Sequence, residues 1–402
     1  MKKSLLTNIV RQSLLNPLLF NNSYSSWHNK PASWPDIRKN CQKGHIYLLA
    51  DTRYPIGFIV SATGGYSVKI DGISYDDYAS NAQFSMADWS GYTATEGYEI
   101  DYPAGAIKAH IVDIFPQTAS ENIAAFKCAR VAASGTEEQG VLWAHFNLTN
   151  AIKIVGVMSS ESGYHNRLVE AITAKNNLII YNVASSLNQS GIYTAFTLCE
   201  ALQYLPVLKA ENQTYASGYY QALRDVPVKK IIIKNNNGGE LFNILKSAKI
   251  EELNIENGLT LGSGTGTWTN ASSAVNLKKF PKINSNKAEN FIMYDVPSLE
   301  PVNIDDRFND IRKLFRFYGT ASVPTPALKS LRVSNNAPFD GATPQIQVDY
   351  TDLDKQALVQ LFNDLPSVSA GQIISIVGAR GTADLTAEDE AIATDKGWTI
   401  AK

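Results

Sequence analysis

A short pattern of apolar and polar positions recurs in the second half of this 402-residue chain. Apolar residues hold its first, fourth and sixth positions, and asparagine holds the eighth. Clear copies cover residues 228–235, 250–257 and 328–335. Apolar residues two positions apart, as at the fourth and sixth positions, point to the same side of a short strand. Asparagine closes the following turn through backbone hydrogen bonds. The recurrence predicts stacked coils, each burying its apolar side only against its neighbours.

Weaker copies extend the pattern over residues 141–340. We expect the strands of successive coils to run parallel and to form one sheet, with variable loops or helices between them. The weaker copies start at Ile152, Leu178, Leu208, Phe280, Phe291 and Leu314.

Residues 41–140 show a different rhythm, with short apolar runs separated by turn residues. Asp71-Gly72 is a two-residue hairpin signal. Short strands at this close spacing predict an antiparallel β-sandwich. The expected strands cover residues 45–50, 57–62, 66–70, 99–102, 106–114 and 124–131.

The last segment, residues 341–402, combines strands with helical spacing. Apolar residues at positions 357, 358, 361 and 362 predict a helix over 354–363, and Thr386 with Asp389 predicts the N-cap of a second helix that ends at Gly397. We expect this segment to cap the last coil. Sandwich, coils and cap together predict an α+β protein.

Apolar residues near the start of the chain follow helical spacing and predict a short amphipathic helix that Pro17 ends. Arg11 interrupts the apolar run before any small-residue cleavage site, so we expect no secretory signal peptide. Residues 1–40 either pack against the next domain or serve attachment or oligomerisation. The candidate residues for the second role are Leu5, Leu6, Ile9, Val10, Leu14, Trp27 and Trp34.

Composition narrows the class of protein. Hydrophobic residues make up 44% of the chain, enough for a sizeable core, and the net charge of −2 gives no global attraction for nucleic acid. No run approaches the roughly 18 apolar residues of a membrane-spanning helix. Three cysteines without metal-ligand spacing predict buried, reduced thiols.

Signals for catalysis or cofactor binding are weak. No two of the five histidines lie three or four positions apart, so no zinc pair is predicted. The glycine-rich run 262–266 lacks the Lys-Ser/Thr ending of a phosphate loop. A calcium site is conceivable at an acidic set, although solvated turn carboxylates are favoured. The set comprises Asp71, Asp76, Asp77, Glu99 and Asp101. We predict no enzyme activity, no metal and no cofactor.

The best candidate for a binding surface is the outward side of the coils. Residues that alternate with the buried apolar pair face outward on each strand. Near residue 314 the register is ambiguous, and one of its two settings exposes aromatic side chains that suit a sugar or protein ligand. This side of the coils either binds a receptor or packs on a neighbouring subunit. The candidate residues are Tyr181, Lys209, Glu211, Lys234, Asn254, Glu256, Phe317, Tyr318 and Arg332.

Several motifs resemble one group of proteins. The ending Leu385-Thr-Ala-Glu-Asp-Glu-Ala-Ile-Ala-Thr-Asp-Lys-Gly-Trp-Thr399 is similar to a C-terminal cap common in tail and fibre proteins of bacteriophages and prophages of gut Bacteroidetes, and the coils resemble irregular, BspA-like leucine-rich repeats. Ser33-Trp34-Pro35 and the stretch from Phe58 to Gly72 also resemble this group, although Ile70-Asp71-Gly72 lacks the group's usual tryptophan. The resemblance covers most of residues 31–402.

The resemblance implies a virion structural protein, a tail or head fibre or another appendage. It implies an Ig/PKD-like sandwich over residues 41–140, a leucine-rich-repeat solenoid over 141–340 and a repeat cap over 341–402. Residues 1–40 would contact other virion proteins, and the repeats would bind a host glycan, a host protein or another virion protein. We expect assembly in the host cytoplasm and a homo-oligomer, with a trimer favoured, and neither nucleic-acid binding nor membrane insertion.

Two other functions fit the same features. The chain could be a bacterial cell-surface leucine-rich-repeat adhesin, or a tailspike that cleaves glycans with two carboxylates contributed by different coils. No specific carboxylate pair stands out in the sequence.

Overall fold

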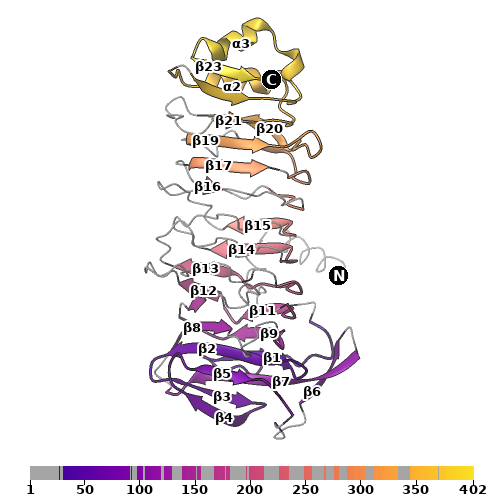
Figure 1. Ribbon diagram of the computed structural model, residues 1–402, viewed down its shortest axis with the longest axis vertical. Helices are drawn as coiled ribbons and strands as arrows, with labels where there is room; N and C mark the ends of the chain where they lie inside the picture. Colours follow the sequence, from indigo (N-terminus) through magenta and orange to yellow (C-terminus); the bar gives the residue numbers. More distant parts are fainter. Residues whose placement is uncertain are drawn as a thin grey trace, which may run out of the picture.

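The computed structural model describes residues 27, 30–90, 92, 97–102, 105–118, 122–128, 138–150, 152–154, 167–176, 178–181, 196, 199–211, 226–234, 249–255, 267–268, 276–279, 288–294, 296–304, 311–333, 345–369 and 371–402. This part of the chain is mostly β, and its two α-helices, α2 (Lys355–Asp364) and α3 (Ala387–Thr394), lie near the C-terminus. The elements stack along one long axis (Figure 1). A stack of coils is thus present, while the α+β class stays a prediction.

Two sheets form the N-terminal end of the stack. Their facing side chains meet, with ring centroids 6.2 Å apart for Phe58 and Tyr66 and 5.8 Å apart for Phe126 and Phe146. The first sheet contains β11 (Ala171–Ala174), β9 (Val141–Phe146), β1 (Ile46–Asp51), β7 (Gly105–Pro116), β3 (Tyr66–Ile70) and β4 (Ile73–Tyr78) in that order, with β6 (Tyr98–Tyr102) also on β7. The second contains β10 (Lys153–Ile154), β8 (Ile123–Cys128), β2 (Ile56–Ala62) and β5 (Gln83–Met86).

The hairpin signal in this region is confirmed. Asp71 and Gly72 have φ angles of 51° and 84°, and β3 pairs antiparallel with β4 around them. Positive φ at both central positions matches the twist of the flanking strands. The sequence prediction lacked β4 and β5. β4 is an edge strand whose residues are mostly exposed, and its bulge and two aspartates, Asp76 and Asp77, oppose pairing with a further strand.

The segment before β1 covers the outer face of the first sheet. Trp27 and Trp34 are 3% and 2% exposed and pack with Ile37 and Cys41 against strands β1, β7 and β9. Trp27 lies edge-to-face on Trp143, with ring centroids 5.2 Å apart. The prediction of Trp27 and Trp34 as attachment or oligomerisation residues is therefore wrong, because both side chains are buried within their own chain.

The coils begin as a continuation of these two sheets. β10 pairs parallel with β8, and β11 pairs parallel with β9. The first coil strands thus add one strand to the edge of each N-terminal sheet. The predicted boundary between residues 140 and 141 falls inside this continuous pairing, so β-domain and coils share hydrogen bonds and core.

We call one column of parallel strands the first ladder. It contains β12 (Leu178–Tyr181), β13 (Leu208–Glu211), β14 (Lys230–Lys234) and β15 (Glu252–Ile255). Bridge pairing of Glu252 with Lys279 and a hydrogen bond from the Glu300 N–H to the Lys278 carbonyl continue it. It ends with β18 (Val302–Ile304) and β20 (Leu328–Leu331). All three clear copies of the sequence pattern contribute strands to this ladder.

A second ladder occupies another side of the coils, and the expectation of one sheet is wrong. It contains β16 (Thr267–Trp268), β17 (Ala288–Tyr294), β19 (Ile311–Tyr318), β21 (Ile346–Gln347), β22 (Gln372–Ser375) and β23 (Trp398–Ala401). The weaker copies at Phe291 and Leu314 belong here, whereas Phe280 lies outside the described residues. The arrows of β14 and β15 point opposite to those of β17 and β19 (Figure 1). This is expected when the chain passes along one side of a coil in one direction and along another side in the opposite direction.

The register within the ladders follows the apolar pattern with one shift. Leu178 pairs with Leu208 and Ile231 with Leu253, as the pattern predicts. Leu208 pairs with Ile233 rather than Ile231. A shift of two residues keeps each side chain on its face, so the core survives it.

The C-terminal segment carries both predicted helices between strands of the second ladder. α2 (Lys355–Asp364) starts where the Asp354 carboxylate accepts the Ala357 N–H at 2.8 Å. α3 (Ala387–Thr394) has a full capping box between Thr386 and Asp389, preceded by the short helix η2 (Thr382–Asp384). Gly397 has φ of 89°, and a Cβ there would lie 2.3 Å from the Val368 carbonyl oxygen, so only glycine fits.

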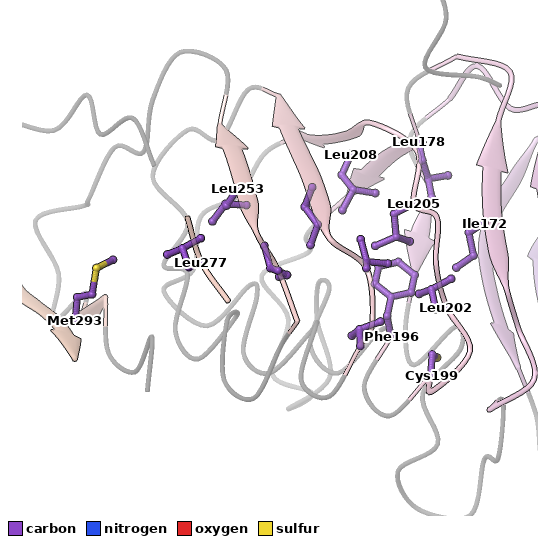
Figure 2. Packing of buried hydrophobic residues seen from close by; sticks show 14 of the residues in the cluster. Ile172, Leu178, Phe196, Cys199, Leu202, Leu205, Leu208, Leu253, Leu277 and Met293 are labelled. Atoms are coloured by element: carbon purple, nitrogen blue, oxygen red, sulfur yellow. The ribbon is translucent and has the colours of Figure 1, made fainter. Parts of the chain in front are cut away.

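One hydrophobic cluster runs through the whole stack. It extends from Ile46 in β1 to Trp398 in β23. Apolar side chains from successive coils, from Ile172 through Leu253 to Met293, lie one after another along this cluster (Figure 2). Each coil therefore buries its apolar side chains against the coils on both sides of it.

The register of β19 can be tested by mutation. Phe317 is fully buried and Tyr318 is partly exposed, so Phe317→Ala should lower the free energy of unfolding by about 3–5 kcal/mol and Tyr318→Ala by clearly less. Chemical denaturation followed by circular dichroism measures both. A larger loss for Tyr318→Ala than for Phe317→Ala would mean that β19 has the opposite register.

Candidate binding surface

Charged side chains on the first ladder form ion pairs between coils. Nζ of Lys229 and Nζ of Lys278 lie 3.1 and 2.6 Å from the carboxylate oxygens of Glu251 between them. Lys230 and Lys279 flank Glu252 in the same way, at 3.2 and 3.5 Å. Two parallel rows thus cross three coils, each row with a carboxylate at its centre.

A similar arrangement occurs toward the C-terminus. Lys329 and Arg380 flank Asp352, with the arginine Nε 2.6 Å from the carboxylate. Arg332 on the same coil as Lys329 forms a two-point contact with Asp364. In these groups the sign of the charge alternates from one coil to the next. Directly opposed like charges destabilise a sheet, so alternation favours this order of coils over a stack slipped by one coil.

The ion pairs shift the acidity of the central carboxylate. Hydrogen bonds from Lys278 and then Lys229 hold the pKa of Glu251 below its ordinary value of 4.5. Exposed ion pairs of this kind each contribute little to stability. Their role here is to fix which coil faces which.

The predicted surface residues on the first ladder are placed only in part. Tyr181, Lys209, Glu211 and Lys234 lie on β12, β13 and β14, where Tyr181 pairs with Glu211 and Lys209 with Lys234 along the backbone. Their side chains, and all of Glu256, lie outside the described residues.

Two of the remaining candidates are confirmed as outward-facing. Asn254 is exposed on β15. The side chain of Arg332 is 47% exposed and reaches Asp364 on α2. Both therefore lie on the surface of the coils, Asn254 on β15 and Arg332 directly after β20.

The two aromatic candidates separate. Phe317 is fully buried, as is Phe315, so its prediction as a surface residue is wrong. The sequence pattern allowed either register of this strand, and the register that buries the two phenylalanines is the one observed. Tyr318 faces outward and stacks on Tyr294 of the preceding coil, with ring centroids 5.2 Å apart. The stack is an aromatic pair between coils, and both tyrosines are partly exposed.

Leu5, Leu6, Ile9, Val10 and Leu14 lie outside the described residues. Their proposed role in attachment or oligomerisation stays a prediction.

Three histidines have polar partners that the sequence did not reveal. His45 Nδ1 lies 2.7 Å from Asp113, and His110 Nδ1 lies 2.5 Å from Asp71. His145 contacts the Thr173 hydroxyl at 2.9 Å, and burial lowers the pKa of its imidazole to about 4. All three are largely buried within the β-domain and its junction with the coils, so they stabilise the fold rather than face a ligand.

Two members of the acidic set have local partners, and the cysteines are buried. Asp71 binds His110 and the Ile111 N–H, and Asp77 accepts from the Ser67 hydroxyl. Within the described ranges no three His, Cys, Asp or Glu side chains gather as metal ligands would. The three cysteines are buried and reduced, as predicted, and burial raises the pKa of Cys128 to about 12.

The rows around Glu251 and Glu252 were not identified as a site from the sequence. The signal was present as the doublets Lys229-Lys230, Glu251-Glu252 and Lys278-Lys279. The first two stand at the same place in clear copies of the pattern. Comparing charge sign at equivalent positions of successive copies would have revealed the alternation.

Comparisons with known proteins give no further identification: no family model, no curated protein and no solved structure matches this chain. None of the helices in the described residues has the length and apolar character needed to cross a membrane.

The coupling between coils predicts a measurable change in acidity. Because both lysines stabilise the Glu251 carboxylate, Lys229→Gln with Lys278→Gln should raise the pKa of Glu251 toward 4.5. A depressed folded-state pKa stabilises the fold above the unfolded pKa, and this contribution is lost as pH falls through the folded value. NMR titration of the side-chain carboxyl measures the shift. An unchanged pKa in the double variant would contradict the ion pairs.

Proposed function

We propose that this protein is a structural component of a bacteriophage virion, a fibre or appendage subunit on the tail or head. The observation that carries the proposal is the single core that joins the β-domain to every coil. Such a core makes a stiff rod, because β10 continues the sheet of β8 and β11 continues the sheet of β9. A stiff rod holds a binding surface at a fixed distance from its attachment point.

The parts of the chain have separate roles in this proposal. The two N-terminal sheets act as an Ig/PKD-like sandwich that spaces and closes the stack. The coils act as a leucine-rich-repeat solenoid whose outward side binds a host glycan, a host protein or another virion protein, and residues 341–402 cap it. No catalysis is required for this role.

Attachment to the particle is assigned to residues 1–26 in this proposal. Trp27 and Trp34 pack against the first sheet. The proposed attachment role is therefore assigned to the residues before Trp27. Leu5, Leu6, Ile9, Val10 and Leu14 would contact other virion proteins or further copies in a homo-oligomer, with a trimer favoured.

The proposal predicts that the protein is present in purified particles. Mass spectrometry and immunogold labelling of gradient-purified virions should detect it, and Leu5→Ser with Ile9→Ser should abolish its incorporation while the purified protein stays folded. Asn8→Ser with Ser13→Ala is the matched control that retains the apolar residues. Detection in the cell envelope of a prophage-free strain, and absence from virions, would instead identify a cell-surface adhesin.

A further inference from the structure

One exposed charged group on the described coils is rich in lysine. We call Lys229, Lys230, Lys278 and Lys279, with Glu251 and Glu252 between them, the lysine strip. The lysine side chains are 49–75% exposed, whereas the glutamates are 30% and 27% exposed. An approaching ligand therefore meets the ammonium groups first, and the carboxylates lie beneath them.

The strip has a net positive charge in a chain whose net charge is −2. Four lysines of the strip against its two glutamates leave an excess of two positive charges, and the exposed Glu300, which follows Lys278 in the ladder, reduces the local excess to one. Further along the rod, Lys329 and Arg380 pair with Asp352 and Asp354, so the charges of that group balance.

The lysines are spaced along the axis of the stack. Lys229 and Lys278 belong to coils separated by one intervening coil, and neighbouring parallel strands lie about 4.8 Å apart. Positive charges of the strip therefore recur at about 10 Å along the rod. An extended polymer with regularly spaced negative charges could follow this row, whereas a single small anion would engage only part of it.

We propose that the lysine strip binds an acidic polysaccharide whose carboxylates lie along the stack axis. This inference rests on the proposed function, in which the outward side of the coils is a binding surface, and it assigns the class of ligand. A single-stranded nucleic acid is disfavoured, because such ligands bind basic grooves that also offer aromatic rings for base stacking. The six side chains of the strip include no ring.

Two variants separate binding from coil stacking. Lys278→Gln with Lys279→Gln and Glu251→Gln with Glu252→Gln each disrupt ion pairs of both rows, but they change the charge of the strip in opposite directions. Lys43→Gln with Lys108→Gln removes two exposed lysines of the β-domain as a matched control for total charge. All are made in the full chain, and thermal unfolding verifies that each is folded.

Binding is measured on immobilised polygalacturonate, with neutral dextran and an oligothymidylate as comparisons. The wild-type chain should bind polygalacturonate in preference to both. The lysine variant should bind about tenfold more weakly, with a salt dependence reduced by about two charges. The glutamate variant should bind more tightly, and the control variant should match the wild type.

Three results would overturn the proposal: no binding of polygalacturonate by the wild type, equal weakening in the lysine and glutamate variants, or tighter binding of oligothymidylate. The first two reject the strip as a polyanion site, and the third rejects the polysaccharide. None of them affects detection of the protein in virions, so this inference can fail while the proposed function stands. Absence from virions with charge-dependent binding would reject the virion role alone.

Discussion

The described coils bury their apolar side chains against the coils before and after them. A parallel strand with one apolar side has no core of its own, so the stack depends on closure at its ends. The N-terminal sheets close one end, because β10 pairs with β8 and β11 pairs with β9. At the other end α3 lies beside β23, and Trp398 is buried with its indole N–H donated to the Pro366 carbonyl.

Stacking of similar coils also raises the problem of order. Apolar contacts alone barely distinguish one leucine-bearing coil from the next, and backbone pairing tolerates the two-residue shift between Leu208 and Ile233. Charge adds the missing discrimination. Lysines on one coil meet glutamates on the next, so a slip by one coil would bring like charges together. The lysines of the strip outnumber its glutamates. The side chains that pair successive coils are therefore also the ones proposed to bind the acidic ligand.

Much of the fold could be predicted from the sequence, and the remainder has physical reasons. Strands of the β-domain and both C-terminal helices follow from local patterns, including the Asp71-Gly72 turn and the Thr386 cap. The assignment of copies to two ladders could not, because Phe291 and Leu253 begin similar apolar pairs and only the path of the chain separates them. The burial of Phe317 and of Trp27 depended on partners far away in sequence. For the candidate surface, the pattern correctly placed Asn254 outward. The alternation of lysine and glutamate between coils could be recognised only once the stacking order of the coils was known.

The central claim is that the β-domain and the coils form one structure joined through β9 and β11. Hydrogen–deuterium exchange of the full chain tests it directly, because paired amides that open together exchange with the same free energy. We predict that peptides covering β11 (Ala171–Ala174) are protected to the same degree as those covering β9 (Val141–Phe146). Rapid exchange throughout β11 beside a protected β9 would contradict the account, because the coils would then be a separate unit.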